Sequence, residues 1–136
     1  MRSRWLLLAS AAYALALVLI GLWRTPVDQN VAVTSLAPVV WLRRLLDLDV
    51  HQSYVLVEAL ANVALFVPLG VLVLLWRPGW GWLASTAVAL GATVAIEVLQ
   101  QALRPERFAS IDDVVANTAG GAIGGLLVVT SRAIRR

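Results

Sequence analysis

Long apolar runs alternate with short polar segments along the chain. Four stretches are apolar over about 20 residues, the length at which an α-helix crosses roughly 30 Å of hydrocarbon. They cover residues 5–23, 54–76, 82–101 and 114–131. The pattern therefore predicts an all-α integral membrane bundle of four transmembrane helices, which forms a single domain over residues 1–136.

The first run has a second interpretation as a cleaved signal peptide. Arg2 and Arg4 precede it, and Ala14 and Ala16 offer the small residues of a cleavage site. The apolar run continues unbroken to Trp23, however, which is longer than a signal peptide needs. We therefore favour a membrane span.

Arginines at the two ends of the chain and the positions of the acidic residues predict how the bundle is oriented. Four spans place both chain termini on the same side, where the arginines at the two ends then share a face. Basic segments favour the cytoplasmic side, so we expect both termini there and most acidic residues on the outer side. The terminal arginines are Arg2, Arg4, Arg132, Arg135 and Arg136.

The first outer loop, residues 24–53, contains a short amphipathic pattern. Ser35 is a candidate N-cap, and Pro38 falls in the first turn that would follow it. Apolar Val39, Leu42 and Leu46 lie opposite charged Arg43, Arg44 and Asp47. This pattern predicts a helix in the outer membrane interface, with a re-entrant loop as the alternative.

Composition supports the membrane class and excludes several chemistries. Hydrophobic residues make up 60% of the chain and charged residues 14%, against roughly 45–50% and 25% in soluble domains. The formal net charge of +3 comes from arginines at the ends of apolar runs, so we exclude nucleic-acid binding. The chain has no Cys and one His, and we predict no bound metal and no cofactor.

Polar side chains within the spans are few, and they gather on one side of the membrane. Placing a charged side chain at the centre of a membrane helix costs about 2.5 to 3.5 kcal/mol of insertion free energy, so ionisable residues there indicate a structural or functional role. Here they occur where the second span starts, where the third ends and where the fourth starts, which is the same side because consecutive spans alternate in direction. The residues are Glu58, Asn62, Glu97, Gln100, Gln101, Asp112, Asp113 and Asn117.

Helical spacing groups these residues into stripes that can converge. Glu97, Gln100, Gln101 and Arg104 follow the spacing i, i+3, i+4 and i+7. Pro105 predicts that the third helix ends at Arg104, and Ser110 is a candidate N-cap for the fourth helix. The candidate ligand-binding residues are Asn62, Glu97, Gln100, Gln101, Arg104, Arg107, Asp113 and Asn117.

Each of these residues also has a structural interpretation. Glu97 could pair with Arg104 or Asn117 to hold helices together, and Asn62 is more readily explained as a hydrogen-bonding residue between helices. Lone His51 is interpreted as an interfacial loop residue rather than a catalytic one.

Glycine and proline positions predict how the helices pack. Gly120, Gly121, Gly124 and Gly125 form two overlapping G-x-x-x-G patterns, which permit close helix contact and make a homo-oligomer through this glycine face conceivable. Pro68 removes a backbone donor within the second span and predicts a kink there. We assign these residues and Gly70 structural roles.

The order of these motifs resembles the VanZ-like membrane protein family. The run at 62–70 reads NVALFVPLG, and it is followed by Glu97-x-x-Gln100, Asp112-Asp113 and Asn117-x-x-Gly120. The resemblance covers residues 62–125, and both Arg104 and Arg107 are candidates for the family's arginine. We transfer no family property to the first span or loop.

The resemblance implies a multi-pass protein of the bacterial cell membrane and a link to resistance against the lipoglycopeptide teicoplanin. Together with the outer polar stripes, it favours binding of an amphiphile, either an envelope lipid or such an antibiotic. Two alternatives stay open. One is an intramembrane enzyme acting on a lipid headgroup, with Glu97 or Asp113 as base or as a ligand of Mg²⁺ or Ca²⁺; the other is an assembly subunit of a membrane complex.

Overall fold

The computed structural model describes residues 2–21, 33–103 and 110–135. Within those ranges the chain is entirely helical apart from its turns. The elements are α1 (Arg2–Gly21), the 3₁₀ helix η1 (Val33–Ser35), α2 (Ala37–Leu45), α3 (Val50–Trp76), α4 (Trp82–Leu103) and α5 (Ile111–Ile134). Four of these helices, α1, α3, α4 and α5, are long and apolar enough to cross a membrane, which confirms the predicted all-α class with four candidate spans.

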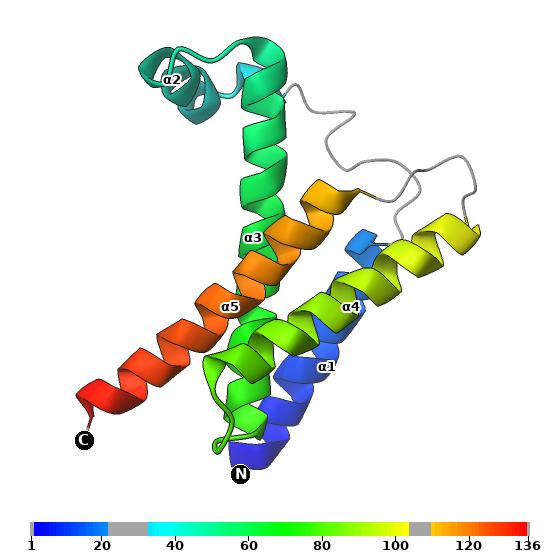
Figure 1. The fold of residues 1–136 in the computed structure, drawn as a ribbon, viewed down its shortest axis with the longest axis vertical. Coiled ribbons are helices and arrows are strands. Elements are labelled where there is room, and N and C mark those ends of the chain that lie inside the picture. The colour runs from blue at the N-terminus through cyan, green and yellow to red at the C-terminus, as the bar shows by residue number, and fades with distance from the viewer. Residues whose placement is uncertain (1, 22–32, 104–109, 136) are drawn as a thin grey trace.

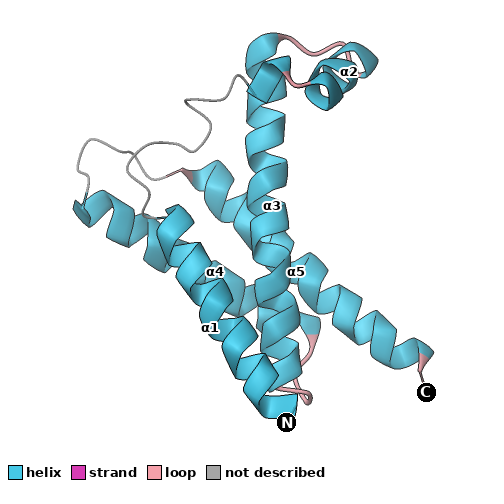
Figure 2. Cartoon of the chain, turned by 180° about the vertical axis from the view of Figure 1, so that it is seen from behind, coloured by secondary structure: helices cyan, strands magenta, loops and turns pink. Residues whose placement is uncertain are grey.

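Helices α3, α4 and α5 form the core, and α1 lies at its side. Helix α5 crosses α3, runs alongside α4 and makes most of its contacts with these two helices (Figures 1 and 2). In the α5 span 39% of residues are buried, against 6% in the α1 span, so α1 is held by few contacts. The start of α1, the turn between α3 and α4, and the end of α5 lie at one end of the bundle (Figure 1). Helix α2 lies beyond its other end.

Helix α3 begins at Val50, earlier than the predicted start at residue 54, because a capping box precedes it. The Asp49 carboxylate accepts a hydrogen bond from the Gln52 amide at 2.7 Å, and the Gln52 side chain accepts one from the Asp49 amide at 3.0 Å. This reciprocal pair satisfies two amides that the first helical turn leaves free. Beyond this start, α3 continues as one helix through Pro68.

The predicted short helix is present as α2, but its N-cap is not Ser35. Ser35 ends the preceding 3₁₀ helix, and Leu36 is the N-cap, with no side-chain hydrogen bond. Pro38 stands in the first turn as predicted, where its missing N–H costs no helical bond. Asp47, with φ at 53°, then adopts the left-handed conformation that turns the chain from α2 toward α3.

The glycines of α5 bring two helices into backbone contact with it. A Cβ atom on Gly120 or Gly124 would overlap a backbone carbonyl oxygen of α3, that of Val63 or Val67. On the adjoining side of α5, a Cβ atom on Gly121 would overlap Ala89 of α4, and one on Gly125 would overlap the Ser85 hydroxyl. Gly70 of α3 sits equally close to the Gly121 carbonyl.

This packing decides the role of the predicted glycine face. Both of its sides are covered by helices of the same chain, and all four of its glycines are buried. The glycines are structural, as expected, but the surface suggested for a homo-oligomer is occupied within the chain by α3 and α4.

Candidate functional site

The polar residues of α3 and α5 meet where α5 begins. The Asn62 amide of α3 donates a hydrogen bond to a carboxylate oxygen of Asp113 in α5, at 2.8 Å. The Ser110 hydroxyl accepts a hydrogen bond from the Asp113 backbone amide at 3.2 Å, which confirms Ser110 as the N-cap of α5. Local capping therefore places Asp113 on the first turn of α5, within reach of Asn62.

Glu97 connects α4 to the same helix start. One of its carboxyl oxygens accepts a hydrogen bond from the Ser110 backbone amide at 3.1 Å, and the side chain is only 9% exposed. The helix dipole places partial positive charge at this end of α5, which favours a carboxylate there. The alternative partners considered for Glu97 were Arg104 and Asn117. Arg104 lies outside the described residues, and the Asn117 side-chain amide donates its hydrogen bond to Thr93 instead.

Asn117 is paired with a residue that the sequence did not single out. Its amide donates to the hydroxyl of Thr93 in α4 at 2.9 Å, and both side chains are buried. The Asn117 side-chain oxygen, also buried, has no hydrogen-bond partner in the described part of the chain. Thr93 could have been found from spacing, because it lies four residues before Glu97 on the same stripe of α4.

Gln100 of α4 connects α1 to the rest of the bundle. Its side-chain amide donates to the backbone carbonyl of Gly21, the last residue of α1, which has no partner within its own helix. The Gln100 side-chain oxygen is buried and, like that of Asn117, finds no partner among residues 2–21, 33–103 and 110–135. Two acceptor oxygens in the cluster are therefore unsatisfied by the described residues.

Other polar residues noted in the sequence do not take part in these contacts or lie outside the described residues. The side chains of Gln101 and Asp112 are exposed, as is that of Glu58, while Arg104 and Arg107 lie outside the described residues. Gln101 lies on one stripe of α4 with Glu97 and Gln100, as predicted, but its side chain is exposed while theirs are buried. We call the five residues Asn62, Glu97, Gln100, Asp113 and Asn117 the polar cluster.

The polar cluster offers carboxyl and amide oxygens in a largely apolar surrounding. Unpaired buried acceptors are costly, about 1 to 3 kcal/mol each, and native proteins rarely leave them so. Hydroxyl or amide donors of a ligand would satisfy the Gln100 and Asn117 oxygens. Within the described ranges, no three His, Cys, Asp or Glu side chains gather as a metal-binding group.

Replacing Thr93 with valine tests whether the Asn117 contact holds α4 to α5. We expect Thr93→Val to lower the free energy of unfolding by about 1 kcal/mol, since interhelical hydrogen bonds in membranes average about 0.6 and reach about 1.7 kcal/mol. Unfolding in mixed detergent micelles measures this change. Thr86→Val is the matched control, because the Thr86 hydroxyl bonds only to the backbone of its own helix. Equal losses from the two variants would contradict an interhelical role for Thr93.

Comparison with known proteins extends the resemblance beyond the polar motifs. The sequence model of the family described as VanZ/LLP1 matches residues 6–132, which includes α1 and the first loop as well as the motifs of the carboxyl-terminal half. Among curated proteins and among solved structures, nothing matches significantly. Because the family match spans nearly the whole chain, this protein belongs to the VanZ/LLP1 family of membrane proteins.

Proposed function

We propose that this membrane protein binds an amphiphile of the bacterial cell envelope at the polar cluster, and that this binding lowers susceptibility to lipoglycopeptides such as teicoplanin. The observation that carries the proposal is the pair of buried, unpartnered side-chain oxygens of Gln100 and Asn117. Gln100 belongs to α4 and Asn117 to α5, and the hydrogen bond between Glu97 and the Ser110 amide joins the same two helices. A headgroup rich in amide or hydroxyl groups carries the hydrogen-bond donors that these acceptors lack, whether it belongs to an envelope lipid or to the antibiotic.

Charge distribution supports an outer-leaflet position for the polar cluster. Arg4, Arg77 and Arg132 belong to the opposite end of the bundle, where α1 starts, where α3 ends and where α5 ends (Figure 1). The positive-inside rule assigns such an end to the cytoplasm. The polar cluster would then face the cell-wall side, where lipoglycopeptides and cell-wall lipids are met.

Helix α2 supports an amphiphilic rather than a purely polar ligand. It lies beyond the same end of the bundle as the polar cluster (Figure 1) and buries none of its residues. Trp41 is 65% and Leu45 63% exposed, one turn apart on α2. An exposed Trp and Leu beside arginines suit the membrane interface, in which an acyl-bearing ligand would insert its tail.

The proposal is tested in a teicoplanin-sensitive Gram-positive host that expresses wild type, Glu97→Gln or Asp113→Asn, with membrane levels quantified. We expect wild type to protect, and both variants to accumulate normally while protection falls to the level of the empty host. Glu97→Gln keeps an oxygen acceptor for the Ser110 amide but removes the carboxyl group, so folding is preserved. Asp112→Asn is the matched control, because it makes the same change next to Asp113 on an exposed side chain.

The outcomes separate the parts of the proposal. If equally abundant wild type gives no protection, the resistance role is rejected. If Asp112→Asn loses as much protection as Asp113→Asn, net charge rather than the polar cluster explains the effect. Binding of teicoplanin to the purified protein, compared with binding of its deacylated form, reports on the tail directly, and equal affinities would contradict recognition of an amphiphile.

We prefer the binding of an amphiphile to the two alternatives considered from the sequence. The carboxyl groups assigned as bases of a lipid-headgroup enzyme both accept hydrogen bonds from protein donors, Glu97 from Ser110 and Asp113 from Asn62. An assembly role would need a surface other than the glycines of α5, which α3 and α4 cover.

A further inference from the structure

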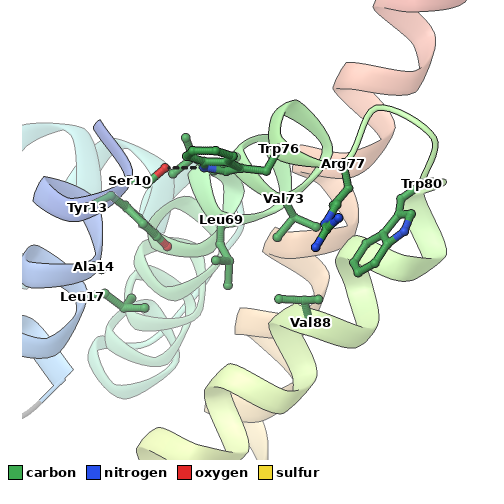
Figure 3. A pocket seen from close by; sticks show the side chains of 11 residues that line it. Ser10, Tyr13, Ala14, Leu17, Leu69, Val73, Trp76, Arg77, Trp80 and Val88 are labelled. Atoms are coloured by element: carbon green, nitrogen blue, oxygen red, sulfur yellow. Dashed lines mark hydrogen bonds between the residues drawn. The ribbon is translucent and has the colours of Figure 1, made fainter. Parts of the chain in front are cut away.

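A groove lies between α1, α3 and the start of α4 (Figure 3). Its lining includes Trp76, Arg77 and Trp80, at the turn from α3 to α4, which lies at the end of the bundle opposite the polar cluster (Figure 1). Its cavity volume is about 310 Å³, at the lower bound of typical ligand sites. The walls are apolar over most of their extent and include Ala14, Leu17, Leu69, Val73 and Val88. An occupant must therefore be apolar along most of its length.

The groove is apolar within and cationic and aromatic at one end. The Arg77 guanidinium lies 5.7 Å from the centre of the Trp80 ring, a cation–π distance, and both side chains line the groove (Figure 3). Trp76 Nε1 donates to the Ser10 hydroxyl of α1 at 2.9 Å. Tryptophan and arginine together mark the depth of lipid headgroups in a bilayer.

Helix α1 is attached across this groove by hydrogen bonds rather than by close packing. Beside the Ser10 contact, the Tyr13 hydroxyl donates to the Leu65 carbonyl oxygen of α3 at 2.9 Å. At the far end of α1, Gln100 bonds to Gly21. In a bilayer no hydrophobic force closes the space between such helices, because lipid chains solvate apolar side chains equally well. A lipid chain can therefore fill the groove at little cost.

The end that carries Arg77 is positively charged without a counter-charge from the described carboxylates. Arg4, Arg132 and Arg135 belong to the same end, and Arg132 donates to the Leu74 and Pro78 carbonyls beside Arg77. The acidic residues that the structure describes all lie toward the other end of the bundle, at the junction of α2 and α3, along the first half of α3, near the end of α4, and in the first turn of α5. An anion bound at Arg77 would meet no repulsion from them.

We propose that this groove binds one anionic glycerophospholipid, with an acyl chain along α1 and α3 and the phosphate at Arg77. The apolar walls select the chain, and the arginine with Trp80 selects an anionic headgroup over a zwitterionic one. This lipid site is separate from the polar cluster and does not depend on the function proposed for it.

Native mass spectrometry of the full chain, released from detergent micelles with added dioleoyl phosphatidylglycerol or dioleoyl phosphatidylcholine, tests the site. We expect one phosphatidylglycerol retained per chain, in preference to phosphatidylcholine. Arg77→Gln should lower phosphatidylglycerol retention about five-fold, since one arginine near a lipid surface contributes about 1 kcal/mol. Ala14→Phe and Val88→Phe, which fill the groove from α1 and from α4, should lower retention of both lipids.

Arg135→Gln is the matched control, because it removes the same charge from the same end without lining the groove. Retention of phosphatidylglycerol by this variant as in wild type supports the proposal. Equal losses in Arg135→Gln and Arg77→Gln would show diffuse charge attraction and overturn it. Equal retention of phosphatidylglycerol and phosphatidylcholine would also overturn the proposal. So would a dimer of the wild-type chain that dissociates in Ala14→Phe and Val88→Phe, because a second chain would then occupy the groove. Unchanged helical content by circular dichroism confirms that the variants are folded.

Discussion

Gly124→Ala is expected to lower the free energy of unfolding by about 1 to 3 kcal/mol, the range found when atoms are forced into a packed core. The added Cβ atom would overlap the Val67 carbonyl oxygen and lie 3.0 Å from the Val71 backbone nitrogen. These are backbone atoms of α3, which cannot rotate away as a side chain does. The helices α3 and α5 must therefore separate, and the contacts along both are weakened. Unfolding in mixed micelles, followed by tryptophan fluorescence, measures the loss.

Gly91→Ala is the matched control for this prediction. Gly91 lies on an exposed face of α4, and a Cβ atom there would meet no heavy atom within 4 Å. Alanine is also the better helix former, by about 0.8 to 1 kcal/mol in water, so this variant should be as stable as wild type or more stable. If Gly124→Ala unfolds at the same point as Gly91→Ala, the close approach of α3 and α5 is wrong.

Glu97→Ala is expected to destabilise the start of α5 by about 1 to 3 kcal/mol. It removes the acceptor of the half-buried Ser110 amide, and a fully buried donor without a partner costs about that much, which sets the upper end of the loss. It also removes a favourable interaction with the helix dipole, worth about 0.3 to 1 kcal/mol. Hydrogen exchange at the Ser110 amide should accelerate in Glu97→Ala and change little in Glu97→Gln, which retains an oxygen acceptor.

Gln101→Ala is the control, since the Gln101 side chain is exposed on the same helix and its loss should cost less than about 0.5 kcal/mol. The comparison also separates stability from function. If Glu97→Gln is as stable as wild type and does not protect against teicoplanin, the carboxyl group acts on a ligand. If Glu97→Gln is as unstable as Glu97→Ala, the role of Glu97 is structural and its carboxyl group takes no part in the proposed binding.

The four spans followed from the sequence because their signal is local. A membrane helix needs a long apolar run, and residues near each run decide where the helix ends. Helix α4 is described as far as Leu103, and its predicted end at Arg104, before Pro105, lies outside the described residues. Ser110 caps α5 because an N-cap hydroxyl bonds to an amide three residues on. The late predicted start of α3 missed an equally local signal, the pair Asp49 and Gln52.

The sequence predicted at which end of the bundle the site residues lie, but not which of their side chains face inward. The sequence placed Asn62 and Asp113 at the same end of the bundle, where their side chains do bond, because antiparallel spans bring alternate ends together. It could not separate Gln100 from Gln101. Successive residues on a helix point about 100° apart, and Glu97 lies between these two directions. The rotation of α4 against its neighbours turns Gln100 inward and Gln101 outward.

By itself, then, the sequence determined the class of the protein, its helices and the end at which polar groups gather, since these depend on composition, spacing and capping. Only the tertiary structure decided which groups meet. It paired Asn117 with Thr93 and Glu97 with the Ser110 amide, and it divided the α5 glycines between α3 and α4. The physical reason is that lipid solvates all apolar faces alike, so helix rotation is set by backbone approach and by hydrogen bonds between distant residues.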